Sequence, residues 1–213
     1  SLEDVVDRSG VPGPILQRLA ASGACASFGL DRREAVWRLQ AILRRGVSPL
    51  LDRSPVPPEP APLPPMELRE CLVRDYAAVG LSYEVHPIEL VRPDLGRHGV
   101  VEATRLSVMG REQQGQGRGS PRVRAAGLVI SRQQPPTAKG FMFLTLEDET
   151  GFVNVVVKPP VVDRFQKTVA LEPMLVVEGV LETEAGVVNL VAERFAPISI
   201  SGVGVRFRSR DFR

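Results

Sequence analysis

Residues that hold metals or form disulfides are scarce in this chain of 213 residues. Cys25 and Cys71 lie far apart without a CxxC pair, and His86 and His98 stand outside any metal-ligand spacing. These absences exclude a disulfide framework and a zinc knuckle, and we expect a reducing, cytoplasmic setting. No apolar run reaches the roughly 20 residues that cross a bilayer, and the N-terminus lacks the basic start of a signal peptide. We therefore expect neither membrane association nor secretion.

An excess of one charge is also lacking, because 27 Lys and Arg residues face 25 Asp and Glu residues, a formal charge of +2. Any nucleic-acid site must then be local rather than a property of the whole chain. Only three basic residues are lysines: Lys139, Lys158 and Lys167. Arginine suits phosphates and planar bases better than lysine does. A GC-rich genome, however, also produces an excess of arginine over lysine.

The first 45 residues have helical periodicity. Apolar residues predict a short helix that ends at Gly10 and a second that ends near Gly23. Asp31 with Glu34 forms a capping-box pattern, and an apolar stripe from Val36 to Leu43 predicts a third, amphipathic helix.

Proline then interrupts the chain: eight prolines lie between Pro49 and Pro65, which no helix or central strand tolerates. This stretch predicts an extended, semi-rigid linker. A fourth helix is expected from Glu67 to about Val79, with Gly80 as its stop. The glycine-rich run from Gln113 to Ser120 predicts a flexible loop.

Beyond this loop the apolar period changes to two. Strands are expected near Val123–Val129, Phe141–Leu146, Phe152–Val157, Met174–Leu181 and Val187–Arg194, with a short helix around Asp163–Thr168. Five strands with a helix between the third and fourth are the arrangement of the oligonucleotide-binding (OB) barrel. The fold class is α+β. We expect a helical unit (1–46), a proline-rich linker (47–65), a helical connector (66–110), a flexible loop (111–121), an OB-fold domain (122–200) and a basic C-terminal tail (201–213).

A complete active site is not encoded. The acidic run Glu147–Glu149 has the composition of a two-metal site, but it occupies a predicted hairpin turn, where we expect it to be solvated. Gly115, Gly117 and Gly119 lack the strand before and the Lys-Ser/Thr after that a phosphate-binding loop needs. We therefore expect no catalytic residue, no metal ligand and no cofactor in this chain.

What remains is binding. OB barrels hold single strands on the face of their second and third strands. Leu144 and Leu146 take the inward parity, whereas Phe143 and Thr145 take the outward parity and offer a stacking platform. The expected nucleic-acid residues are Phe143, Thr145, Asn154, Arg122, Arg124, Arg132, Lys139 and Lys158. The alternative is that helices cover Phe143 and the arginines only solvate the barrel.

Four segments in order resemble the C-terminal region of bacterial C-family DNA polymerases, which are similar to DNA polymerase III alpha. The segments are 2–35, 79–88, 123–129 and 143–151. The similarity is greatest to the error-prone translesion branch, whose chains end in a tail like Ser209–Phe212. It implies a DNA-directed DNA polymerase whose catalytic regions, with their divalent metal ions, precede Ser1. Residues 1–46 would end the helix–hairpin–helix, duplex-binding region, although its glycine-rich turn is absent.

The resemblance also implies partners. Ser48–Asp52 stands where clamp-binding relatives carry a glutamine and an aromatic residue, so contact with the sliding clamp would be indirect. In the error-prone branch, an inactive Y-family-like polymerase and other mutasome proteins of the SOS response would link the chain to the clamp. The partner-binding residues expected in the tail are Arg206, Phe207, Arg208, Arg210 and Phe212. We expect a monomer in the bacterial cytoplasm, associated with the nucleoid.

Three interpretations follow. The first is a non-catalytic module of a translesion polymerase that guides single-stranded template DNA and docks mutasome partners. The second is a protein-docking module whose OB face never contacts DNA. The third is an OB module of the anticodon-binding kind, which the helical start and the proline linker disfavour.

Overall fold

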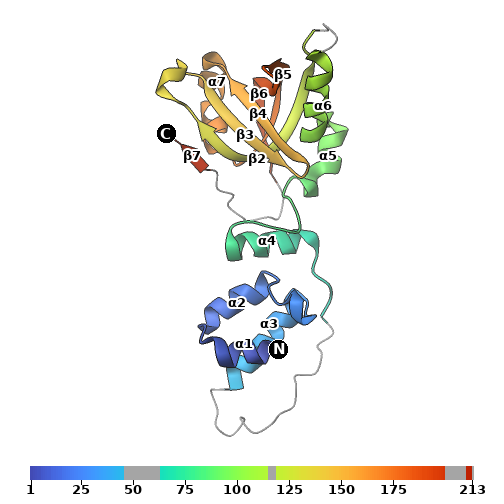
Figure 1. The fold of residues 1–213 in the computed structure, drawn as a ribbon, viewed down its shortest axis with the longest axis vertical. Helices are drawn as coiled ribbons and strands as arrows, with labels where there is room; N and C mark the ends of the chain where they lie inside the picture. Colours follow the sequence, from blue (N-terminus) through green and yellow to red (C-terminus); the bar gives the residue numbers. More distant parts are fainter. Residues whose placement is uncertain (46–62, 115–118, 200–209, 213) are drawn as a thin grey trace. The chain divides into compact units, whose positions relative to one another are not determined.

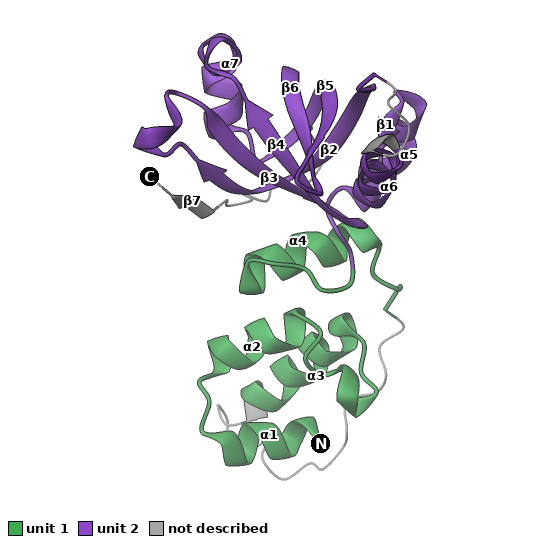
Figure 2. Cartoon of the chain, turned by 45° about the horizontal axis from the view of Figure 1, so that its top comes forward, with its two compact units in different colours: residues 1–84 green, residues 85–213 purple. Residues whose placement is uncertain are grey.

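The structure, a computed structural model, describes residues 1–45, 63–114, 119–199 and 210–212. The chain divides into two compact units, Ser1–Glu84 and Val85–Arg213 (Figure 2). No helix in the described part of the chain is long and apolar enough to cross a membrane.

The first unit is helical, and two of its helices end at their predicted glycines. It contains α1 (Leu2–Ser9), α2 (Gly13–Ala21), α3 (Arg32–Arg45) and α4 (Leu68–Val79), with a 3₁₀ turn, η1 (Ala26–Phe28). Ser1 and Asp4 form a capping box at the start of α1. Gly10 and Gly80 adopt the left-handed conformation that ends α1 and α4. The backbone N–H of Glu34 donates to the Asp31 carboxylate at 2.8 Å, half of the predicted capping box of α3.

The core of this unit is formed by the first three helices and the turn between α2 and α3. Leu16, Ala20, Leu39 and Ile42 are among its buried side chains. Helix α4 belongs to the same unit, because Arg32 on α3 forms a largely buried ion pair with Asp75 on α4. Residues 66–84 are therefore grouped with the first three helices, unlike the connector expected from 66 to 110.

The second unit contains the predicted five-stranded OB barrel (Figure 1). Its strands are β2 (Arg122–Gln133), β3 (Met142–Asp148), β4 (Gly151–Val157), β5 (Met174–Glu184) and β6 (Val187–Pro197). They pair in the order β2-β3-β4-β6-β5, and β5 closes the barrel by pairing with β2. As predicted, a helix, α7 (Pro159–Leu171), lies between the third and fourth barrel strands.

Two helices complete the barrel core from opposite sides, α7 and α6 (Ala103–Gln114) (Figures 1 and 2). Buried Val162 and Val169 of α7, and Ala103 and Leu106 of α6, join the barrel side chains in one cluster. Gly110 lets α6 approach the β5–β6 hairpin closely, because a Cβ at this position would overlap Val188. Helix α6 also extends to Gln114, into the segment expected to be loop.

Smaller elements for which the sequence predicted no individual bounds surround the barrel. A 3₁₀ turn, η2 (Glu89–Val91), leads into α5 (Arg92–Arg97) and β1 (Val100–Val101), which pairs in parallel with β2. The C-terminal strand β7 (Arg210–Phe212) also pairs with β2 in parallel. These last residues were expected to form a tail, and instead their backbone extends the sheet.

The barrel needs a glycine at the bulge between Glu178 and Gly179. A Cβ on Gly179 would overlap the carbonyl group of Val191 on β6, and a backbone atom cannot swing away as a side chain can. We expect Gly179→Ala to lower the free energy of unfolding by about 2 kcal/mol or more, within the range of overpacking in cores.

Urea denaturation followed by circular dichroism measures this loss. Gly96→Ala is the matched control, because Gly96 lies in α5 with open space at its Cβ position. That variant should be as stable as the parent or slightly more stable. Equal denaturation midpoints for Gly179→Ala and the parent would show that the strands do not approach this closely.

Candidate nucleic-acid interface

The outer face of β3 and β4 carries two exposed aromatic rings. Phe143 is 39% exposed and Phe152 is 59% exposed. The strand register opposes Phe143 to Val156, Thr145 to Asn154 and Glu147 to Phe152, so these residues share one face. Leu144 and Leu146 between them are buried in the barrel, as their parity predicted.

The two rings are suitably spaced for more than one base. Phe152 lies opposite Glu147, which is four residues from Phe143 along β3. This separation is about 13 Å at the usual rise of a strand. Half-buried Thr145 and exposed Asn154 lie between the rings. This arrangement alternates stacking surfaces with polar groups that can hydrogen-bond a base edge.

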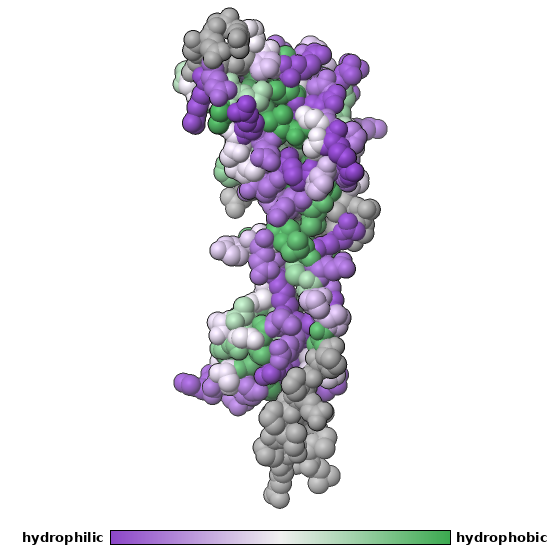
Figure 3. Space-filling model, turned by 90° about the vertical axis from the view of Figure 1, so that its right-hand side faces the viewer, coloured by the Kyte–Doolittle hydropathy of each residue, from purple (hydrophilic) through white to green (hydrophobic). Residues whose placement is uncertain are grey.

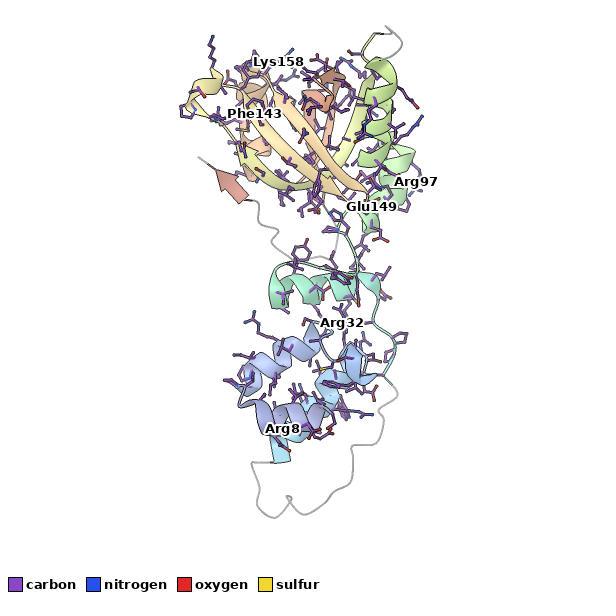
Figure 4. All side chains as sticks on the ribbon, in the orientation of Figure 1. Arg8, Arg32, Arg97, Phe143, Glu149 and Lys158 are labelled. Atoms are coloured by element: carbon purple, nitrogen blue, oxygen red, sulfur yellow. The ribbon has the colours of Figure 1, made fainter. Side chains whose placement is uncertain are left out.

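Two lysines adjoin the Phe143 end of this face. Lys139 ends the 3₁₀ turn η3 (Pro136–Ala138) just before β3, and Lys158 follows β4 at the start of α7. Both side chains are exposed. Figure 4 places Phe143 and Lys158 at one end of the barrel and Glu149 at the other. The face therefore has a basic end and an acidic end.

Arg122 and Arg124 lie away from this face. Both belong to the first half of β2, which pairs with β5, whereas β3 pairs with the second half from Leu128 onward. Arg122 forms an ion pair with Glu193. Arg124 donates to Glu178 at 2.9 Å, and this hydrogen bond lowers the pKa of Glu178. The prediction that these arginines surround the OB face is corrected accordingly.

Arg132 is also unsuited to phosphate binding, because its side chain is buried. It is 8% exposed, and its Nε donates to the carbonyl oxygen of Val169 at 2.7 Å. Its Nη2 donates to the carbonyl oxygen of Glu172. These acceptors are the unpaired carbonyls at the end of α7, so Arg132 caps that helix.

The acidic run at the β3–β4 turn is not solvated as expected. Asp148 is 4% exposed, and its carboxylate accepts from Arg92 at 2.8 Å and from the backbone N–H of Ala103 at 3.0 Å. Its other oxygen accepts from the backbone and hydroxyl of Thr150 and from the N–H of Gly151. Arg92 also pairs with Glu149. The run thus anchors the hairpin to α5 and α6.

These contacts set the ionisation of Asp148. Burial raises its pKa, but the hydrogen bonds from Thr150 and Ala103 and the charge of Arg92 outweigh burial, and the pKa lies below the usual 3.8. Asp148 is therefore held as a carboxylate that accepts hydrogen bonds.

Other predicted positions are only partly described. Arg206, Phe207 and Arg208 lie outside the described residues. For Arg210 and Phe212 the structure gives the backbone in β7. Within the described ranges no group of three or more His, Cys, Asp or Glu side chains is placed to hold a metal ion.

Comparison with known families agrees with this geometry. The profile of the tRNA_anti-codon family, an OB-fold nucleic acid binding domain, matches residues 123–198. An error-prone DNA polymerase from Ruegeria pomeroyi is 39% identical over 90% of this chain. Another, from Anaeromyxobacter dehalogenans, is 38% identical over the whole chain. The resemblance to error-prone DNA polymerases is confirmed.

The chain spans 17% and 18% of the length of these two polymerases. Among solved structures, asparaginyl-tRNA synthetase from Pyrococcus horikoshii is 27% identical, with a TM-score of 0.32, over 37% of this chain and 20% of that one. A small single-stranded DNA binding protein from Mycoplasma pneumoniae is 13% identical, with a TM-score of 0.31, over 35% of this chain and 90% of that one.

Two features were missed at the level of sequence. Phe152 has the same parity as Asn154 on β4, so alternation alone could have included it. The anchor at Asp148 was also detectable, since Asp followed two residues later by Thr and then Gly is a common side-chain-stabilised turn. Arg92 was not detectable, because it lies 56 residues away in the chain.

Asp148→Asn should destabilise the second unit. The substitution keeps the shape but removes the charge that pairs with Arg92, which is mostly buried, and we expect a loss of about 3 kcal/mol at neutral pH. Because the pKa of Asp148 is lower in the folded state, its contribution is complete above pH 3.8 and is lost as the pH falls through the folded value. The stability difference between parent and variant should therefore shrink on acidification.

Urea denaturation from neutral to acidic pH tests this. Asp94→Asn is the control, since it breaks an exposed pair with Arg97 and should change stability little. A difference between parent and Asp148→Asn that stays constant well below pH 3.8 would contradict the assignment.

Proposed function

We propose that the second unit binds single-stranded DNA across β3 and β4 as a non-catalytic module of an error-prone DNA polymerase. The observation that carries this proposal is the pair of exposed phenylalanines on one face of an OB barrel, Phe143 and Phe152. Isolated exposed rings on a soluble surface are ordinary, but two on the strands that bind nucleic acid in this fold favour stacking on bases.

The side chains on this face contact different parts of the single strand. The two rings stack on bases, the Thr145 hydroxyl and Asn154 amide hydrogen-bond base edges, and Lys139 and Lys158 contact phosphates. Stacking accepts any base, because every base presents a π-face. Such a surface is suited to holding a template whatever its sequence, including damaged positions.

In the full-length polymerase, we propose, this module guides single-stranded template during translesion synthesis and DNA repair. Nucleotidyl transfer and its divalent metal ions belong to other regions of the polymerase. Mutasome partners, among them an inactive Y-family-like polymerase, dock on surfaces other than β3–β4 and link the protein indirectly to the sliding clamp. The setting is the bacterial cytoplasm, at the nucleoid.

Protein docking is the second candidate function, and a separate hollow favours it. This hollow, of about 630 Å³, lies in the second unit, and its lining includes apolar Leu95, Val176 and Phe195 and charged Arg124, Glu178 and Arg194. Figure 3 shows hydrophobic side chains set among hydrophilic ones on the visible surface of this unit. A partner peptide could use this hollow while the β3–β4 face remains open.

Phe143→Ala and Phe152→Ala should each weaken binding of labelled oligo-dT by about 1–3 kcal/mol, the contribution of one stacked base. Fluorescence anisotropy at low and moderate salt measures it. Binding by the parent chain should weaken as salt rises, because Lys139 and Lys158 displace counterions from the phosphates.

Tyr83→Ala is the matched control, because this ring is 97% exposed but lies in the first unit. It should bind oligo-dT like the parent. Undetectable or salt-independent binding by the parent, with no change in binding on Phe143→Ala, would instead favour the docking function.

A further inference from the structure

Strand β2 has an edge that the five barrel strands do not cover. Its pairing with β5 ends at Leu128, which opposes Met174, and the N–H of Val129 makes a last hydrogen bond to Pro173. Beyond Leu128, from Ser131 to Gln133, β5 no longer pairs with the side of β2 that faces away from β3. Open strand edges readily accept another strand.

The C-terminal strand occupies this edge. Strand β7 pairs with β2 in parallel, with Arg210 opposite Ser131 and Phe212 opposite Gln133. Figure 1 shows β7 at the margin of the barrel. The sheet that includes β3 and β4 is therefore one strand wider than the OB barrel alone.

The register continues the two rows of the candidate interface. Gln133 opposes Phe143 on β3, and Phe143 opposes Val156 on β4. Phe212 therefore occupies the same cross-strand row as Phe143, two strands away, or about 10 Å at the usual strand spacing.

In the second row, Ser131 opposes Thr145, which opposes Asn154. Arg210 is the register partner of Ser131 and so joins the row of the two polar residues. The first and last residues of β7, an arginine and a phenylalanine, are thus in register with the rows that carry the proposed hydrogen-bonding and stacking groups.

The composition of this end of the chain fits a polyanion. Residues 204–213 contain four arginines, two phenylalanines and one aspartate. The face itself has lysines only at one end, Lys139 and Lys158, and Glu147 adds a negative charge to it. Within β7 itself, Arg210 would supply positive charge where Arg122, Arg124 and Arg132 do not, while Asp211 is the register partner of Arg132 and so lies outside the two rows.

We propose that β7 is part of the nucleic-acid surface, so that Arg210 and Phe212 contribute to binding the same single strand as Phe143. This inference rests on the proposed function and extends its footprint from two strands to four. It assigns these residues to DNA rather than to a protein partner.

The test compares two double variants of the full chain by fluorescence anisotropy with labelled oligo-dT. Arg210→Ala with Phe212→Ala changes β7, and Arg206→Ala with Phe207→Ala removes the same residue types a few positions earlier. We expect the first pair to raise the dissociation constant at least fivefold and the second to change it less than twofold. A chain ending at Ser209 should behave like the first pair.

Direct contact is tested by a photo-cross-linking phenylalanine at position 212, which should cross-link to oligo-dT, while the same group at Tyr83 should not. Circular dichroism checks that the β7 variants retain the barrel. Equal weakening by both double variants, or unchanged binding by both, would overturn the role of β7. Unchanged DNA binding with lost recovery of a protein partner would assign the strand to docking instead.

These outcomes are separable from failure of the proposed function. If the parent chain binds no oligo-dT, the proposed function fails and this inference fails with it. If the parent binds and Phe143→Ala weakens binding while the β7 variants do not, only this inference fails.

Discussion

The alternation of buried and exposed residues in β3 and β4 is the constraint on which the rest of the structure depends. Leu144, Leu146, Val153 and Val155 fill the barrel, and burying them leaves Phe143, Thr145, Phe152 and Asn154 outside. Because the period of a strand is two, a slip of one residue would exchange the two sets and expose the core. The packing that stabilises the barrel therefore also fixes the composition of its outer face.

The Asp148 carboxylate holds this register at the hairpin. It joins the turn between β3 and β4 to Arg92 of α5 and to the first N–H of α6, two elements that precede the barrel in the chain. A buried carboxylate is costly unless it is paired and hydrogen-bonded, and this one has both kinds of partner. The helices before the barrel are thus connected to the strand pair that presents the aromatic rings.

Local signals were sufficient for most of the fold. Capping residues predict that helices end at Gly10 and Gly80. The apolar period and the turn residues predict the five barrel strands and α7. Strand parity also placed Phe143 outside. Long-range pairings could not be predicted: the two halves of β2 pair mainly with different strands, and Arg122 and Arg124 lie beside β5 rather than β3. Arg132 could not be placed either, because its acceptors are carbonyls at the end of α7, about forty residues along the chain.

The central claim is that the two phenylalanine rings contact bases. Nuclear magnetic resonance of ¹³C-labelled phenylalanine rings during titration with oligo-dT tests it most directly. The account predicts that the ring signals of Phe143 and Phe152 shift strongly, because stacked bases carry ring currents, while those of Phe28 in the first unit stay in place. A shift confined to the ring of Phe195, which lines the hollow near Leu95 and Val176, with the signals of Phe143 and Phe152 unchanged, would contradict it.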